Sequence, residues 1–321
     1  MKFEHILKVT SPGSPVFALK QATTSLEMKN ILYLTDYSRY SQQVFRYALE
    51  LAHHFKASVT LAHVYAPLMP ASPVNFEEMM DYGPSPSPET QAVAQWDRER
   101  ERLEYFAANH TPNAYKDVPF FFELPAGHPV PEIVRLQQEK HFGLTVMGLN
   151  SAGNLSHLVL GRVASGMIDR SASPLLLVPP TADYHGIKRI LFATDLREDD
   201  LPIINGLLEW AKAFQASLTC LWAVDPEGLS PHSGEKETAE ASIKKLRATE
   251  AFQSGELDFS MIESNKENFE KNILRAVDTQ HADLVVMQTH RRGWWRHILE
   301  ESTTKDIASE VFIPILIYNE I

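Results

Sequence analysis

The stretch Ile31-Leu32-Tyr33-Leu34-Thr35-Asp36 reveals how this chain is organised, because a close copy, Ile190-Leu191-Phe192-Ala193-Thr194-Asp195, follows it at an offset of 159 residues. Residues 55–60 recur at the same offset. Toward the end of each copy the offset falls to 140, as Ser173-Pro174-Leu175-Leu176 and Ile313-Pro314-Ile315-Leu316 show. Self-similarity of this kind predicts two copies of one structural unit.

The duplication sets the expected domain boundaries. We expect an N-terminal extension over residues 1–27, a first domain over residues 28–180 and a second domain over residues 188–321. The length of 321 residues agrees with two domains of about 150 residues each. The first copy is longer because residues 67–88, rich in Pro, Ser and acidic side chains, form an insertion that we predict to be a surface loop.

Composition and charge restrict the classes of function. The chain is 44% hydrophobic and 22% charged, which is ordinary for a globular protein, and no apolar run approaches the roughly 20 residues of a membrane span. A net charge of -11 argues against nucleic-acid binding, which depends on Lys and Arg neutralising phosphates. The single cysteine, Cys220, favours a reducing compartment, and residues 1–27 lack the pattern of a secretory signal. We therefore expect a cytoplasmic protein without membrane contact.

Each copy alternates strands and helices. Residues 31–34 are a short apolar run, as expected of a parallel strand covered on both faces, and residues 41–55 carry the stripe of an amphipathic helix. Residues 91–109 predict a long charged helix whose inward face carries Ala92, Trp96, Leu103 and Phe106. The remaining strands of the first copy are expected at residues 59–64, 120–124, 144–147 and 175–178, and the remaining helices at residues 130–140 and 159–171. This alternation predicts an open, doubly wound α/β domain.

In such sheets a ligand lies beyond the carboxyl ends of the strands, where the strand order reverses. This rule selects the loops after the first and fourth strands, which begin with Asp36 and Gly148 in the first copy and with Asp195 and Gln288 in the second. His63 falls within the predicted second strand, and we interpret it as a core residue. The sequence contains no zinc helix, nucleophile elbow or Walker loop, so catalysis has no positive support.

The same stretches resemble the universal stress protein family in a tandem arrangement. The resemblance covers nearly the whole chain from Met28 onward and rests on several short motifs taken together. These motifs are Leu34-Thr35-Asp36-Tyr37-Ser38, Leu61-Ala62-His63-Val64, Val146-Met147-Gly148, Leu158-Val159-Leu160-Gly161 and Ser173-Pro174-Leu175-Leu176-Leu177-Val178. It implies two flavodoxin-like (Rossmann-like) domains, each with a five-stranded parallel sheet in the order 3-2-1-4-5. It also implies pairing through the last strands, here within one chain, and a homodimer remains a further option.

The resemblance also implies a nucleotide site in the first copy. Members that bind ATP carry a glycine loop, whose matching positions here are Gly148, Ser151, Gly161 and Arg162, and two of the four are kept. Glycines and helix N-termini suit phosphate binding, and Gly153 is a nearby substitute for the lost glycine. Arg162 either pairs with phosphate or fills the site.

The remaining contacts implied by the family fall outside the glycine loop. Adenine and ribose contacts would fall on Asp36 and on the backbone of Val64, and the implied ligand is ATP with Mg²⁺. The alternative for the first copy is a purely structural loop.

The second copy departs from this pattern. The positions that match the glycine loop are Gln288, Arg291, Glu301 and Ser302, so we expect this domain to be degenerate toward ATP. Asp195 is retained, but an Asp in this place also serves turns and helix caps.

Residues 290–297 form a cluster of Arg, His and Trp, in which Trp294 and Trp295 either contact a protein partner or bind an anionic or planar ligand.

Two hypotheses of function follow. The first is a stress-response or signalling module that binds ATP or another nucleotide in the first domain, with the second domain as its structural partner. The second is a ligand-free scaffold that contacts other proteins. Slow ATP hydrolysis is a third hypothesis.

Overall fold

The computed structural model describes most of both copies. The described residues are 28–67, 87–149, 161–194, 200–224, 241, 243–248, 250–255, 257–263, 269–288 and 313–319. The expected N-terminal extension, Ser151, Gly153, Asp195 and the cluster at residues 290–297 lie outside them.

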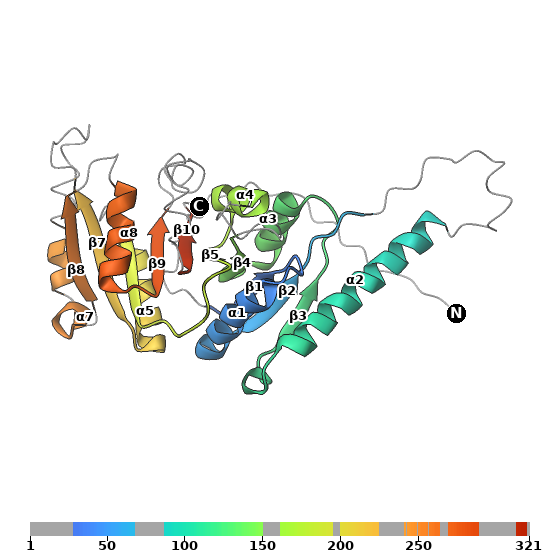
Figure 1. The fold of residues 1–321 in the computed structure, drawn as a ribbon, viewed down its shortest axis with the longest axis horizontal. Coiled ribbons are helices and arrows are strands. Elements are labelled where there is room, and N and C mark those ends of the chain that lie inside the picture. Colours follow the sequence, from blue (N-terminus) through green and yellow to red (C-terminus); the bar gives the residue numbers. More distant parts are fainter. Residues whose placement is uncertain are drawn as a thin grey trace, which may run out of the picture.

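The first copy alternates strands and helices (Figure 1). Its strands are β1 (Asn30–Leu34), β2 (Ser58–Ala62), β3 (Phe120–Glu123), β4 (Leu144–Gly148) and β5 (Leu175–Val178). Its helices are α1 (Ser41–Phe55), α2 (Pro88–His110), α3 (Pro129–Lys140) and α4 (Arg162–Arg170), with a 3-10 turn at Asn113–Tyr115.

The second copy repeats the alternation. Its strands are β6 (Arg189–Thr194), β7 (Ser217–Val224), β8 (Leu257–Glu263), β9 (Leu284–Gln288) and β10 (Ile315–Tyr318). Its described helices include α5 (Asp200–Phe214), α7 (Glu250–Gln253) and α8 (Phe269–Gln280). No described helix of the chain is both long and apolar enough to cross a membrane.

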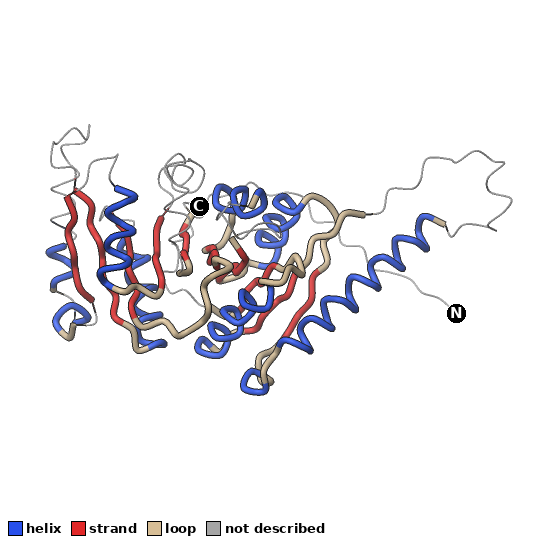
Figure 2. The backbone as a smooth tube through the Cα atoms, in the orientation of Figure 1, coloured by secondary structure: helices blue, strands red, loops and turns tan. Residues whose placement is uncertain are grey.

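All these strands belong to one sheet with the order β3-β2-β1-β4-β5-β10-β9-β6-β7-β8. Neighbouring strands are parallel within each copy, and β5 pairs with β10 in antiparallel register, with Leu176 opposite Leu316. Figure 2 shows the strands interleaved with helices across both halves. The predicted α/β fold is therefore confirmed, since a mainly parallel sheet is flanked by helices.

Burial on both faces explains why β1 reads as an uninterrupted apolar run. Ile31 and Tyr33 pack into the core under α1 and α2, and Leu32 packs into the core under α3 and α4. Successive side chains of a strand point to opposite faces, so a strand covered on both faces needs apolar residues at consecutive positions.

The prediction for α2 was correct in its inner part and wrong at its N-terminal end. Leu103 and Phe106 are buried, but Ala92 is exposed and Trp96 is 38% exposed. Figure 1 shows the reason, because the N-terminal part of α2 extends beyond the sheet. Helical periodicity predicts which face of a helix is apolar, but not how far the neighbouring sheet reaches.

Aromatic side chains connect the two copies on the face that carries α1 and α5. The ring of Phe55 lies 5.4 Å from that of Trp210 and 5.8 Å from that of Phe214, and the His54 ring lies 4.3 Å from Phe214. These residues join one hydrophobic core that extends across both halves. The halves therefore share packed surface in addition to the β5–β10 ladder.

A buried amide organises the end of the first copy. Gln137 of α3 is 2% exposed and donates from Nε2 toward the hydroxyl oxygens of Thr145 (2.7 Å), Ser171 (2.9 Å) and Ser173 (3.1 Å). Its Oε1 accepts from the backbone N–H of Ala172 at 3.0 Å. Gln137 thus ties α3 to β4 and to the turn before β5, because buried polar groups must find partners.

We expect Gln137→Leu to lower the free energy of unfolding by about 3 kcal/mol, because several buried hydroxyl and amide groups lose their partner. Urea unfolding of the full chain measures this change. Gln138→Leu is the matched control, since Gln138 is the exposed neighbour on the same helix, and it should change stability by less than about 0.5 kcal/mol. Equal losses from both variants would contradict a structural role for the network.

Candidate functional site

A cavity of about 150 Å³ lies at the carboxyl ends of β1, β2 and β4. β1 lies between β2 and β4 in the sheet. The chain runs outward from β1 to β2 and β3 and then returns to β4 on the other side of β1, so the strand order reverses at this point. The cavity therefore occupies the place where open α/β sheets bind ligands. It is lined mainly by apolar side chains, with a few polar groups at its rim.

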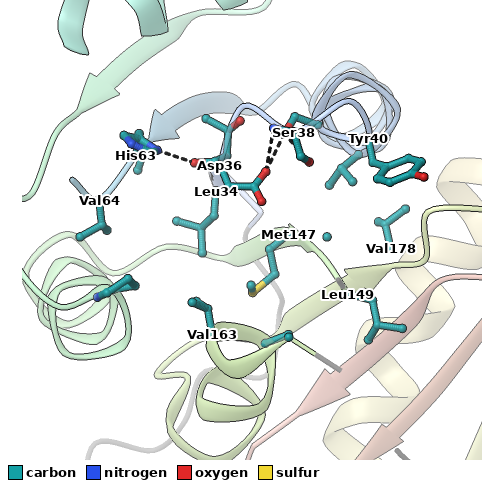
Figure 3. Close-up of a pocket in the computed structure, with 18 of the residues that line it drawn as sticks. Leu34, Asp36, Ser38, Tyr40, His63, Val64, Met147, Leu149, Val163 and Val178 are labelled. Carbon is teal, nitrogen blue, oxygen red and sulfur yellow. Dashed lines mark hydrogen bonds between the residues drawn. The ribbon is translucent and has the colours of Figure 1, made fainter. Parts of the chain in front are cut away.

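Figure 3 shows Leu34, Met147 and Val163 pointing toward one another in the middle of the pocket. They come from the ends of β1 and β4 and from the first turn of α4. Leu149 and Val178 lie on another side of the pocket in the same view. An apolar floor of this kind suits a flat, weakly polar ring system.

The Asp36 carboxylate stands at the rim and organises the turn into α1. Its Oδ1 accepts from the backbone N–H of Ser38 at 2.9 Å and from the hydroxyl of Ser41 at 3.1 Å. Tyr37 in this turn has a left-handed φ of 56°, which such a side-chain bond helps to hold. Asp36 is exposed, and its Oδ2 bonds to no other described residue, so one carboxylate oxygen is left for a ligand.

The backbone of Val64 lies at the wall of the cavity without a partner among the described residues. His63 and Tyr65 donate their N–H groups to the carbonyls of Glu123 and Pro125, on the β3 side. Neither the N–H nor the C=O of Val64 bonds to any described residue, because the chain turns away after β1. Val64 therefore presents one donor and one acceptor at the position where the ladder with β1 would continue.

The interpretation of His63 as a core residue was wrong. β2 ends at Ala62, and His63 is half-buried at the wall of the cavity. Its Nδ1 lies 2.8 Å from the carbonyl oxygen of Thr35, so Nδ1 carries a proton that it donates to this acceptor. The sequence signal that was missed is the polar turn after Thr35. This turn ends β1, so the residues after Ala62 have no pairing partner on the β1 side.

An aromatic and cationic stack supports His63 from the side of α2. The Tyr37 ring lies 4.5 Å from the His63 ring, and the Arg102 guanidinium carbon lies 4.0 Å from the centre of the Tyr37 ring. Burial, together with the Glu99 carboxylate, raises the pKa of Tyr37. Tyr37 therefore stays a neutral phenol that offers its face to Arg102.

Four of the sequence-derived site residues meet at this cavity, namely Asp36, Val64, Gly148 and Gly161. Arg162 begins α4, but it is exposed and is not among the lining residues. Ser151 and Gly153 fall outside the described residues. Ser38, Tyr40 and Ser41 line the cavity as well and were missed, because hydroxyl groups in a turn carry no distinctive spacing.

The second copy has larger side chains at several of the equivalent positions. Gly148, Ala62 and Val178 correspond to Gln288, Leu221 and Tyr318, whereas Leu34 is replaced in the opposite direction by Ala193. Leu221 and Tyr318 are buried.

Charge also differs between the two copies. Ser41 of the first copy corresponds to Asp200, which is 1% exposed and accepts from the hydroxyl of Thr194 at 2.6 Å. A buried carboxylate at this position disfavours an anionic ligand. Across the described residues there is no group of three or more acidic, His or Cys side chains arranged to hold a metal ion.

We expect Asp36→Ala to lower the unfolding free energy by about 1 kcal/mol in the absence of any ligand, because Ser38 and Ser41 lose their acceptor. Asp36→Asn keeps the Oδ1 acceptor and should cost less than about 0.5 kcal/mol. Urea unfolding of the ligand-free chain compares the two variants. A loss of equal size in both would mean that the negative charge, and not the acceptor, holds the turn.

Comparison with known proteins agrees with this architecture. The model of the universal stress protein family matches residues 27–179 and again residues 186–319. A universal stress protein from Archaeoglobus fulgidus has a similar structure, with a TM-score of 0.63, 15% identity and coverage of 92% of this chain and 98% of that chain. A functionally unknown protein from Pseudomonas aeruginosa PAO1 is similar with a TM-score of 0.53 and 14% identity, over 92% of this chain and 94% of that one. No curated protein matches the sequence. Because the two family matches cover most of its length, the chain belongs to the universal stress protein family as a tandem member.

Proposed function

We propose that the first domain binds an adenine nucleotide in the cavity beyond β1, β2 and β4, and that the second domain is a degenerate structural partner. The observation that carries the proposal is the backbone of Val64 at the wall of an apolar cavity, whose N–H and C=O bond to no described residue. The protein would then act as a stress-response or signalling module in the cytoplasm, where the occupancy of this site reports the level of the nucleotide.

The cavity offers complementary groups for the base. An adenine edge places an amino donor beside a ring-nitrogen acceptor, which matches a backbone C=O beside a backbone N–H. Val64 supplies such a pair, and Leu34, Met147 and Val163 supply apolar contact for the ring faces. Leaving the Val64 groups unpaired when the base is buried would cost free energy, so the site favours a base with this edge.

The rim offers an acceptor for a sugar. Oδ1 of Asp36 is engaged by Ser38 and Ser41, which fixes the direction of the carboxylate and leaves Oδ2 toward the solvent. Ribose hydroxyl groups donate to such an oxygen, and hydrogen bonds to a charged acceptor are the stronger kind. Gly148 and Gly161 line the same cavity beside the first turn of α4, where backbone N–H groups suit a phosphate oxygen.

We expect the freshly purified full chain to bind adenine nucleotide at one site per chain. Native mass spectrometry measures the bound mass, and the shift in melting temperature with millimolar nucleotide measures the stabilisation. Gly148→Gln introduces the residue that the second copy carries at this position, and it should weaken binding at least about tenfold by filling the cavity. The reciprocal variant Gln288→Gly is the control and should leave the affinity unchanged.

The ligand-free melting temperature of Gly148→Gln shows whether the variant is folded. No bound mass and no thermal shift with the native chain would reject the proposal and leave a protein-interaction scaffold, in which Trp294 and Trp295 are the first residues to test. Weakened binding in Gln288→Gly would place a site in the second domain instead.

A further inference from the structure

The outer strand β3 of the first copy presents an open edge that consists of Phe120, Phe121, Phe122 and Glu123 (Figure 1). On the β2 side, the carbonyl of Glu123 accepts from the N–H of His63. Backbone groups of successive residues alternate in direction, so the N–H and C=O groups of Phe120 and Phe122 point away from β2. Neither residue has a backbone hydrogen bond to another described residue. Among the described residues, nothing therefore pairs with the outer side of β3.

A groove of about 700 Å³ lies beside this edge, with Thr60, Phe121 and Phe142 in its lining. The strand register aligns Phe121 with Thr60 and Leu32, and Leu32 packs under α3. The groove thus lies on the α3 face of the sheet. Phe121 is 56% exposed. An exposed aromatic side chain on an open edge invites pairing with another strand, so proteins normally cover such an edge or give it a charge.

The second copy carries a charge at the equivalent place. On its outer strand β8, Asp258 lies opposite Thr219, as Phe121 lies opposite Thr60 on β3. Asp258 is exposed, and a carboxylate on an edge strand disfavours an added strand. The duplication therefore supplies an internal comparison, in which one outer strand has a charge at this position and the other has an aromatic side chain. This difference favours a cover for β3.

The sequence contains a segment whose pattern matches this edge. Residues 2–10 read Lys-Phe-Glu-His-Ile-Leu-Lys-Val-Thr, in which polar and apolar side chains largely alternate, as in a half-buried strand. The alternation is interrupted by the adjacent apolar residues Ile6 and Leu7. On β3, Phe121 faces the groove and Phe122 packs against the core on the α2 face. Two adjacent apolar residues are therefore expected of a strand that lies beside Phe121 and Phe122.

Residues 11–27 are long enough to connect this segment to the described chain. Met28 is buried and precedes β1, and β3 is two strands away from β1. A strand added outside β3 lies three strand spacings from β1, about 15 Å. The connecting residues span up to about 55 Å when extended. The shortest connection ends the added strand at the amino end of the sheet, which makes it antiparallel to β3.

We infer that residues 2–10 pair with β3 of the same molecule as an added antiparallel edge strand. The register that agrees with the apolar pattern places Leu7 beside Phe121 and Ile6 beside Phe122. Ile6 then exchanges backbone hydrogen bonds with Phe122, and the side chain of Leu7 covers the exposed ring of Phe121. The same register places His5 opposite Glu123, a favourable cross-strand pair.

Amide hydrogen exchange of the full chain, resolved to single residues by NMR, tests the inference. We expect the Phe122 amide to exchange at least about tenfold more slowly in the native chain than in Leu7→Asp, which places a carboxylate against Phe121. Ser14→Asp is the matched control, because it introduces the same side chain in the connecting residues, and it should leave this rate unchanged. The amide of Leu61 in the central part of β2 should exchange equally slowly in all three proteins, which shows that they are folded.

Three results would overturn the inference. The first is fast exchange of Phe122 in the native chain, and the second is slow exchange that persists in Leu7→Asp. The third is protection of Phe122 that rises with protein concentration, together with a doubled mass in light scattering, because a second copy would then cover β3.

Discussion

Antiparallel pairing of β5 with β10 is the contact on which the arrangement of the two halves depends. Leu175, Leu176 and Leu177 lie opposite Ile317, Leu316 and Ile315, and all six are buried. A parallel sheet exposes a row of unpaired backbone groups at each edge, and this pairing removes one edge from each half. The aromatic contacts of Phe55 with Trp210 and Phe214 then hold the halves on one face of the joined sheet.

The joined sheet allows the two halves to carry different side chains at the carboxyl ends of their strands. Substitutions at the carboxyl ends of the strands do not disturb the pairing, so the second copy keeps its sheet while Gln288, Leu221 and Tyr318 take the place of smaller residues. Buried Asp200 adds a negative charge at the same place. Fold and candidate site are therefore separable, since the core positions preserve the fold while the positions at the strand ends differ between the copies.

Much of the fold could be predicted because the duplication repeats the same apolar strands. Comparison of Ile31–Leu34 with Ile190–Ala193 identifies the first strand of each copy. The location of the site followed from strand order, which brings Asp36 and Gly148 to one cavity. The role of His63 could not be predicted, because periodicity does not show that pairing with β1 stops at Ala62, where β1 turns away. The exposure of Trp96 and Arg162 depends on how far neighbouring elements extend, which a one-dimensional pattern does not contain.

Antiparallel pairing at the joint also gives the chain two unlike poles. The strands of the first half run opposite to those of the second, so the carboxyl ends of β1 and β4 face away from those of β6 and β9. A molecule bound at one pole cannot touch the other. Any effect of its binding on the second half must pass as strain through the strands and the common core. The cavity of the first copy therefore lies at one end of the molecule, and the equivalent positions of the second copy lie at the opposite end, with the β5–β10 pairing between them.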